Sequence, residues 1–434
     1  MENKILEKAK AFYFMVVAVM MYYFITQQLN LGLHVTYRHV FALLLAVSAI
    51  VMFLYKPNVA RGITSFKEAC VYSLPLGITT VASLFVWFME TVDTGVISRG
   101  LSSSFVFTNM LSFALGAGAM LYIFGKRGLW YNLIAILIAN MLMLLTIIAK
   151  NGLAGFLSEF VTLVVTFADE TGDIIIQAEI HELAFCIGAY MIYMLYKPKK
   201  DIIFLILFLI SSFCFLCALK RIAIIAIVIA LALGYFLKFI SRYSKKTAGK
   251  LVTFLTIVVV LLLIAYIALI KADAFELLEE AGINTSGRVE IYNAVDKFYE
   301  FHPGFLGNGI GFLTYQLNTF MKVGVASVHN DFLQHFIDLG FWGYIIWLLS
   351  ITLVRVRYFG RNGNIEDAII TFMLTVYLII VSTTDNTMNY PLLTGVLAIL
   401  MMGNSYDEKV RETEFKMFGY ISEANKEEES DSLL

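Results

Sequence analysis

Residues 286–343 read SGRVEIYNAVDKFYEFHPGFLGNGIGFLTYQLNTFMKVGVASVHNDFLQHFIDLGFWG, a polar and glycine-rich interval in a chain that is otherwise strongly apolar. Long structured intervals between apolar segments are where functional groups usually lie, because loops carry the chemistry while the apolar segments act as scaffold. We therefore expect the functional residues of this protein to lie in this interval, and we expect the flanking sequence to position them.

The flanking sequence has the composition of a membrane protein. Of the 434 residues, 59% are hydrophobic and 15% are charged, against roughly 45–50% and 25% in soluble domains. Apolar runs long enough to cross about 30 Å of hydrocarbon recur along the chain. The predicted fold class is an all-α integral membrane protein. The net charge of −1 and the lack of a basic stretch interleaved with aromatic residues argue against a nucleic-acid partner.

We expect about twelve transmembrane helices, with a large, partly helical outer loop at 271–340. Nine helices lie within residues 1–270 and three within 341–403. The expected spans are 11–29, 39–55, 70–90, 104–124, 129–149, 183–196, 201–219, 221–240, 251–270, 341–354, 366–383 and 388–403.

The distribution of lysine and arginine predicts the orientation, because cytoplasmic loops carry an excess of both. Basic residues precede the first span and fill alternate loops, whereas the opposite loops have few. The basic set consists of Lys4, Lys8 and Lys10; Lys56, Arg61 and Lys67; Lys126 and Arg127; Lys197, Lys199 and Lys200; Arg242, Lys245, Lys246 and Lys250; and Arg355, Arg357 and Arg361. Both termini are predicted to be cytoplasmic, and the 150–182 and 271–340 loops to face outward from the cytoplasmic membrane. Residues 404–434 are predicted to form a charged, solvated cytoplasmic tail.

Both outer loops carry helical signals. The apolar stretch from Phe156 to Phe167 is predicted to lie along the membrane interface as a short helix. In the larger loop, the N-cap residue types Asn284, Thr285 and Ser286 precede a predicted helix. Its apolar stripe is Ile291, Val295 and Phe298, and Pro303 with Gly304 is predicted to end it. A second helix is predicted to begin near Asn330 and to stop at Gly340.

Two arginines are candidates for binding an anion. Arg288 opens the first loop helix, where it would either form a surface salt bridge or hold a phosphate in its planar fork. Tyr292 shares its helical face. Lys220 and Arg221 form the hinge between two apolar spans, on the predicted outer side. They would either snorkel to lipid head groups or mark a substrate path.

His329 is the candidate general base, because the free imidazole titrates near working pH, although a lone histidine is more often structural. Asp331, His335 and Asp338 fall on one helical face and raise the alternative of a metal site. No further ligand of known position supports a metal site on this face, so we expect no metal or other cofactor. Gly307, Gly309 and Gly311 would form a nest of backbone N–H groups for an anion, which by itself is a weak signal.

The order of these motifs resembles the O-antigen ligase and polymerase family, which includes the Wzy-type polysaccharide polymerases. The shared features are Ser-Gly-Arg at 286–288, His-Pro and the glycines at 302–311, His-Asn at 329–330, and Leu-Gly-x-x-Gly at 339–343. A looser likeness surrounds Arg221, which in the family often follows a serine and here follows Lys220. The resemblance implies that Arg221, Arg288 and Tyr292 bind a lipid diphosphate and that His329 assists the acceptor hydroxyl. Lys220, Asn330 and the three glycines would support them.

The resemblance implies a glycosyltransferase that joins polyprenyl-diphosphate-linked oligosaccharide repeats of a capsule, exopolysaccharide or O-antigen. Diphosphate is a good leaving group, so no metal is required, and attack opposite it would invert the anomeric centre. The expected partners are these lipid-linked oligosaccharides, membrane lipids and other polysaccharide-assembly proteins. A ligase that transfers glycan to another acceptor and a flippase for lipid-linked units remain alternatives. A transporter would place its ionisable groups near mid-membrane between repeats, whereas this sequence has them at the predicted outer face.

Overall fold

A computed structural model describes residues 10, 13, 16–18, 37–89, 94–166, 181–218, 220–282, 287–319, 328–360, 364–387 and 390–417. Within these ranges all regular secondary structure is helical. The helices are α2 (Tyr37–Tyr55), α3 (Val59–Tyr72), α4 (Leu74–Met89), α5 (Thr94–Phe124), α6 (Gly128–Asn151), α7 (Leu153–Thr166), α9 (His181–Tyr196), α10 (Ile202–Ala218), α11 (Arg221–Tyr243), α12 (Lys245–Lys271), α13 (Ala274–Glu280), α14 (Arg288–Val295), α15 (Phe312–Thr319), α16 (Asp331–Leu349), α17 (Arg355–Phe359), α18 (Ile365–Ser382) and α19 (Pro391–Gly403).

Five helical runs in the described residues are long and apolar enough to cross a membrane. They are Phe113–Asn151, Arg221–Tyr243, Lys245–Lys271, Asp331–Phe359 and Ile365–Ser382, and α3 with α4 would make a sixth. Several of the twelve expected spans correspond instead to shorter apolar helices, such as Ile202–Ala218 and Pro391–Gly403. The expected first span, 11–29, lies mostly outside the described residues. An all-helical membrane fold is therefore confirmed, with five or six candidate spans.

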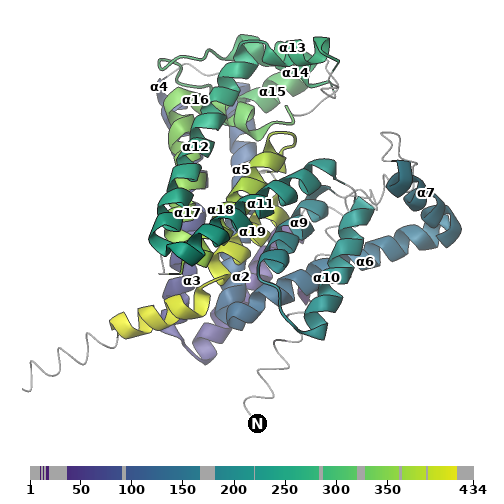
Figure 1. Cartoon of the computed structure of the whole chain (residues 1–434). Coiled ribbons are helices and arrows are strands. Elements are labelled where there is room, and N and C mark those ends of the chain that lie inside the picture. The colour runs from purple at the N-terminus through teal and green to yellow at the C-terminus, as the bar shows by residue number, and fades with distance from the viewer. Residues whose placement is uncertain are drawn as a thin grey trace, which may run out of the picture.

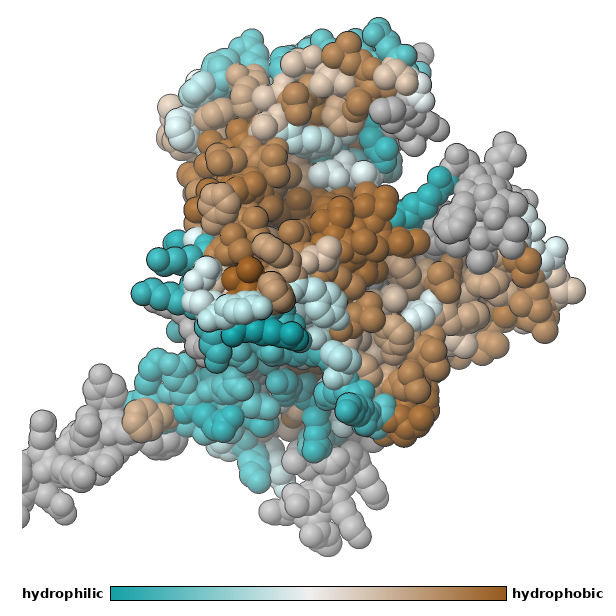
Figure 2. Space-filling view, in the orientation of Figure 1, coloured by the Kyte–Doolittle hydropathy of each residue, from teal (hydrophilic) through white to brown (hydrophobic). Residues whose placement is uncertain are grey.

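The helices pack into a bundle with a cap at one end. Figure 1 shows α13, α14 and α15 together at one end of the molecule, and α3 with the helix that follows α19 at the opposite end. Hydrophobic residues form a broad band between the more hydrophilic ends in Figure 2. Such a band is the surface that a bilayer would cover.

The expected span 70–90 begins too late. The chain is already helical from Val59, and α3 and α4 meet at a 49° bend around Ser73. Of the charged residues that suggested a loop, Lys56 follows α2, whereas Arg61 and Lys67 belong to α3. α3 is amphipathic and buries Thr64, Ser65 and Glu68. Arg355 stabilises the break, because its buried guanidinium donates to the Tyr72 carbonyl at 2.7 Å and lies 4.0 Å from the Tyr72 ring. That carbonyl ends α3 and has no partner within its own helix.

The cap has a core of its own. Val295, Leu313, Val328, Phe332 and Phe336 are buried there against the C-terminal part of α12. The expected end of the first loop helix at Pro303 was wrong. The helix ends at Val295, and one 3-10 turn continues to Phe298. Tyr299 then turns to extended backbone, and its buried ring lies 4.7 Å from the Lys271 ammonium.

The start and break of α16 agree with the sequence prediction. Asn330 is its N-cap, with its side chain accepting from Phe332 and Leu333. Gly340 interrupts the helix with φ 70° and ψ −177°. A helix is present where one was predicted from Phe156 to Phe167: α7 covers Leu153–Thr166, and Phe167 lies outside the described residues. The N-cap of α14 is Gly287 in left-handed backbone, and Asn284, Thr285 and Ser286 lie outside the described residues.

The segment after α19 is not a solvated tail throughout. Residues 406–417 are helical and lie on α3. Tyr406 bonds Ser65 at 2.6 Å, Lys409 bonds Glu68 at 2.6 Å, and both ends of the Lys409–Glu68 pair are buried. The prediction of a solvated tail was wrong for this segment, because a charged residue that pairs with an opposite charge in the interior cannot be distinguished in the sequence from one that is solvated. Residues 418–434 lie outside the described part of the chain.

Candidate functional site

The candidate site lies where the cap meets the ends of α12 and α18. Its first element is α14, a short helix whose Ile291, Tyr292 and Val295 are buried. Burial of this face fixes the rotation of the helix and so the direction of Arg288 at its first position. The Arg288 Nη2 donates to the Thr384 carbonyl at 3.0 Å. Arg288 is thereby held against the chain that follows α18.

Asn330 organises the polar groups beside Arg288. Its side-chain oxygen accepts the N–H groups of Phe332 and Leu333, each at 3.1 Å. Its side-chain nitrogen donates to the hydroxyls of Tyr266 and Tyr292, each at 2.9 Å. These bonds use the full hydrogen-bonding capacity of a fully buried amide. Asn330 therefore joins α12, α14 and α16 at one point.

His329 precedes this buried residue and is itself half-exposed. Its φ of 50° places it in the left-handed region, a conformation that costs a non-glycine residue on the order of 1–3 kcal/mol. The neighbouring Val328 and Asn330 are completely buried, so they hold the strained residue in place. His329 Nδ1 lies 3.9 Å from Asp385 Oδ1.

Asp385 is a site residue that the sequence analysis missed. Its Oδ1 also accepts the backbone N–H of Asn386 at 2.8 Å and the hydroxyl of Tyr390 at 3.0 Å. Adjacent residues thus contact the two main candidates: Thr384 contacts Arg288, and Asp385 faces His329. The signal was present in the sequence, because Thr383 to Thr387 is a polar run between two apolar helices, where ionisable residues are commonly functional.

Lys220 and Arg221 lie at the same end of the bundle. α11 packs along α18, with Gly234 against Met373 and Ile227 near Tyr377. This pairing is antiparallel, so the start of α11 lies toward the end of α18, where Thr384 and Asp385 follow. Lys220 is the N-cap of α11 without a side-chain capping bond, and the Arg221 side chain is exposed.

The glycine motif has a structural explanation that the sequence did not reveal. Asn308 and Gly309 donate their N–H groups to the carbonyls of Ile337 and Asp338, and Phe341 donates to Phe305. The first two bonds satisfy carbonyls that α16 leaves free where Gly340 breaks the helix, and the third satisfies a carbonyl of the loop. Ile310 donates to Ser83 of α4 at 3.0 Å. Asn308, Gly309 and Ile310 thus donate their N–H groups to other parts of the protein, whereas the anion nest expected around Gly307, Gly309 and Gly311 stays a prediction.

The metal alternative finds no support in the described residues, among which no three His, Cys, Asp or Glu side chains form a group that could hold a metal. His335 Nδ1 instead donates to the Asp331 carbonyl of its own helix at 2.7 Å, and its ring stacks on Trp347 at 4.0 Å. His302 is also locally bonded, to Glu300 at 2.8 Å and to the Gly304 N–H at 2.9 Å.

The fold and the site together define a class: a multi-pass membrane protein with a cationic and polar site at one end of its helical bundle. Residues 205–348, about a third of the chain, match the family model described as O-antigen ligase. The match supports the O-antigen ligase and polymerase superfamily, whose members handle lipid-linked glycans with glycosyltransferase-like activity. No curated protein matches the chain. The matched region contains Arg221, Arg288 and His329 but ends before Thr384 and Asp385.

Proposed function

We propose that this protein is a polysaccharide polymerase that joins polyprenyl-diphosphate-linked oligosaccharide repeats at the outer face of the cytoplasmic membrane. One observation carries the proposal. An arginine suited to a diphosphate and a histidine suited to proton transfer, 41 residues apart in sequence (329 − 288), converge on the adjacent residues Thr384 and Asp385. The match of residues 205–348 to O-antigen ligases supports the substrate class.

In the proposed reaction, Arg288 and Arg221 bind the diphosphate of the donor, a growing glycan on its lipid. A hydroxyl oxygen of the acceptor repeat forms a bond to the anomeric carbon while the bond from that carbon to the diphosphate oxygen breaks. The diphosphate leaves with the electron pair and gains negative charge. Fixed cations stabilise that charge most strongly in the transition state, where it develops.

His329 takes the proton of the attacking hydroxyl. Its partial exposure leaves the ring accessible to a substrate, and the nearby Asp385 carboxylate would stabilise the imidazolium that forms. Asp385 is a positioning residue in this scheme, held by Asn386 and Tyr390. Attack from the side opposite the diphosphate inverts the anomeric centre, and the proton of the acceptor hydroxyl remains on His329 when the diphosphate leaves.

A ligase is the second candidate, because the matched family model is described as O-antigen ligase. The purified protein, reconstituted with a synthetic lipid-linked repeat, distinguishes the two. A polymerase forms products of increasing repeat number on the polyprenyl carrier. Transfer only to a different acceptor would establish a ligase. Movement of the lipid between leaflets without a new glycosidic bond would overturn both and indicate a transporter.

A further inference from the structure

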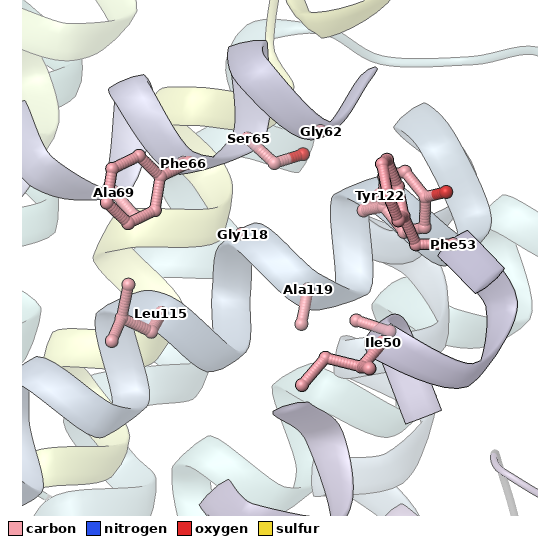
Figure 3. A pocket seen from close by; sticks show the side chains of 11 residues that line it. Ile50, Phe53, Gly62, Ser65, Phe66, Ala69, Leu115, Gly118, Ala119 and Tyr122 are labelled. Carbon is pink, nitrogen blue, oxygen red and sulfur yellow. The ribbon is translucent and has the colours of Figure 1, made fainter. Parts of the chain in front are cut away.

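A cavity lies between α2, α3 and α5 (Figure 3). Its α3 wall is at the opposite end of the bundle from the cap (Figure 1). Its volume is about 300 Å³, which is the lower end of the range for small-molecule sites. The wall is almost entirely apolar, with Ile50, Phe53, Phe66, Leu115 and Tyr122 among its side chains. It therefore fits a hydrocarbon group and not a polar metabolite.

Small residues create the space. A Cβ added at Gly62 would meet only the Phe53 ring, at 3.6 Å, which is ordinary van der Waals contact. Gly118, by contrast, lies tightly against the Ser65 backbone and lets α3 and α5 approach closely. At the rim, Ile50 and Phe66 are 57% and 65% exposed. The cavity thus opens sideways toward the surface that lipid chains would cover.

Basic residues end the same three helices next to the cavity. Lys56 follows α2, three residues after Phe53, Arg61 precedes Gly62 in α3, and Lys126 and Arg127 follow α5. Lys56, Lys126 and Arg127 are exposed. Asp407 and Arg61 flank Gly125, and Lys126 also interacts electrostatically with Asp367 of α18. Four cations against these two carboxylates leave a net positive charge beside the apolar cavity.

We propose that this cavity holds an acyl chain of an anionic glycerophospholipid, with the lipid phosphate at Lys56, Arg61, Lys126 and Arg127. A basic pocket between helices at the cytoplasmic surface has the right chemistry for such a lipid. The proposal rests on the expected orientation of the chain, and its choice between lipids rests also on the proposed function. A polyprenyl diphosphate fits less well, because the candidate site for its head group lies at the other end of the bundle.

Occupancy would also stabilise a junction with the C-terminal segment. Ser65 contributes to the cavity wall, and its hydroxyl bonds the buried Tyr406 hydroxyl at 2.6 Å. Tyr406 also donates to the Arg61 carbonyl at 3.3 Å. A ligand that binds only this packed arrangement raises the stability of the folded protein by mass action.

The test is native mass spectrometry of the delipidated full-length protein, titrated separately with phosphatidylglycerol and phosphatidylcholine. We expect preferential binding of phosphatidylglycerol. Gly62→Leu and, independently, Ala119→Leu fill the cavity and should abolish that preference. Leu205→Phe, an enlargement at an exposed position of α10 outside the cavity, is the matched control and should bind like the unmodified protein. Thermal unfolding without lipid establishes that each variant is folded.

The charges have their own test. Lys56→Gln with Lys126→Gln should weaken phosphatidylglycerol binding by about tenfold or more, since each cation near the surface contributes about 1 kcal/mol, and should leave phosphatidylcholine binding unchanged. Retained phosphatidylglycerol binding in both cavity-filling variants would overturn the site. Equal binding of the two lipids would overturn the anionic preference. Displacement of phosphatidylglycerol by a stoichiometric amount of polyprenyl phosphate would overturn the assigned occupant.

Discussion

Arg288 is the first residue of α14, and His329 directly precedes the N-cap of α16. Buried neighbours restrict the conformation of each residue. Tyr292 and Val295 bury the face of α14 behind Arg288, and Asn330 anchors His329 in left-handed backbone. Positions fixed in this way suit groups that must meet developing charge without rearranging.

Replacement of Arg288 by lysine tests the role of the guanidinium. Lysine keeps the charge but cannot hold two phosphate oxygens in a fixed fork, so we expect Arg288→Lys to lower turnover by about 10²–10³-fold, as for loss of one preorganised donor. Arg221→Lys should be milder if Arg221 supplies a point charge. The measurement is turnover by equal amounts of purified protein. The amount of each variant in the membrane before purification is the control for its production. Normal polymer formation by Arg288→Ala would remove the proposed diphosphate contact.

Replacement of His329 by alanine should lower turnover by on the order of 10²–10⁴-fold, the usual effect of removing a general base. Binding of the lipid-linked donor should remain, because it is assigned to the arginines. His302→Ala is the matched control, since His302 is exposed and bonded only to nearby residues of its own loop in the contacts described above. Near-normal turnover by His329→Ala would make this histidine structural.

His335 is unsuitable as a neutral control for His329. Its ring is buried between the Asp331 carbonyl and Trp347. Its removal leaves a cavity, which typically costs a few kcal/mol in the free energy of unfolding.

Asp385→Asn tests the residue that the sequence did not identify. The amide preserves the size and removes the charge that faces His329, so we expect kcat to fall by roughly tenfold with little change in KM. A merely structural role would instead change stability or both kinetic constants together. The steady-state kinetics should be measured beside the thermal unfolding of the same preparation, and an unchanged kcat would exclude the positioning role.

At the scale of the elements, Gly307 and Gly340 bring the glycine loop and the break in α16 into backbone contact. Both have positive φ, of 90° and 70°, and a Cβ on either would overlap the main chain of the other segment. This contact sets where α16 is interrupted and hence how the cap sits on the bundle.

Gly340→Ala should therefore lower the free energy of unfolding by more than about 3 kcal/mol, combining left-handed strain with steric overlap. Gly152→Ala is the matched control, because Gly152 has a φ of 82° but nothing within 4 Å of an added Cβ. It should cost only about 1 kcal/mol. Thermal unfolding in detergent compares the two, and equal shifts would mean that the close approach contributes nothing.

At the scale of the whole molecule, the prediction is that the cap lies outside the cell and the segment after α19 lies inside. In a protein whose four cysteines are replaced by alanine, Glu280→Cys should react with an impermeant thiol reagent in intact cells, and Lys416→Cys only after permeabilisation. Both residues are exposed in the structure. The reason is the excess of lysine and arginine at the end of the bundle that bears Lys416. Reaction of Lys416→Cys in intact cells would reverse the topology.

The sequence by itself determined the features that are local or compositional. Apolar runs predicted an all-helical membrane protein, Asn330 predicted the start of α16, and Gly340 predicted its interruption. The ordered motifs around Arg288 and His329 predicted the superfamily. The structural predictions among these succeed because membrane spanning, N-capping and positive φ are properties of short segments. They need no partner from elsewhere in the chain.

Only the tertiary structure decided which distant groups meet. Asp385 faces His329 across 56 residues of sequence. Asn308 and Gly309 of the glycine loop donate to α16 just before its break at Gly340, and Lys409 neutralises Glu68 across 341 residues. No local pattern encodes such pairs, because the energy of a buried polar group depends on the partner that packing brings to it.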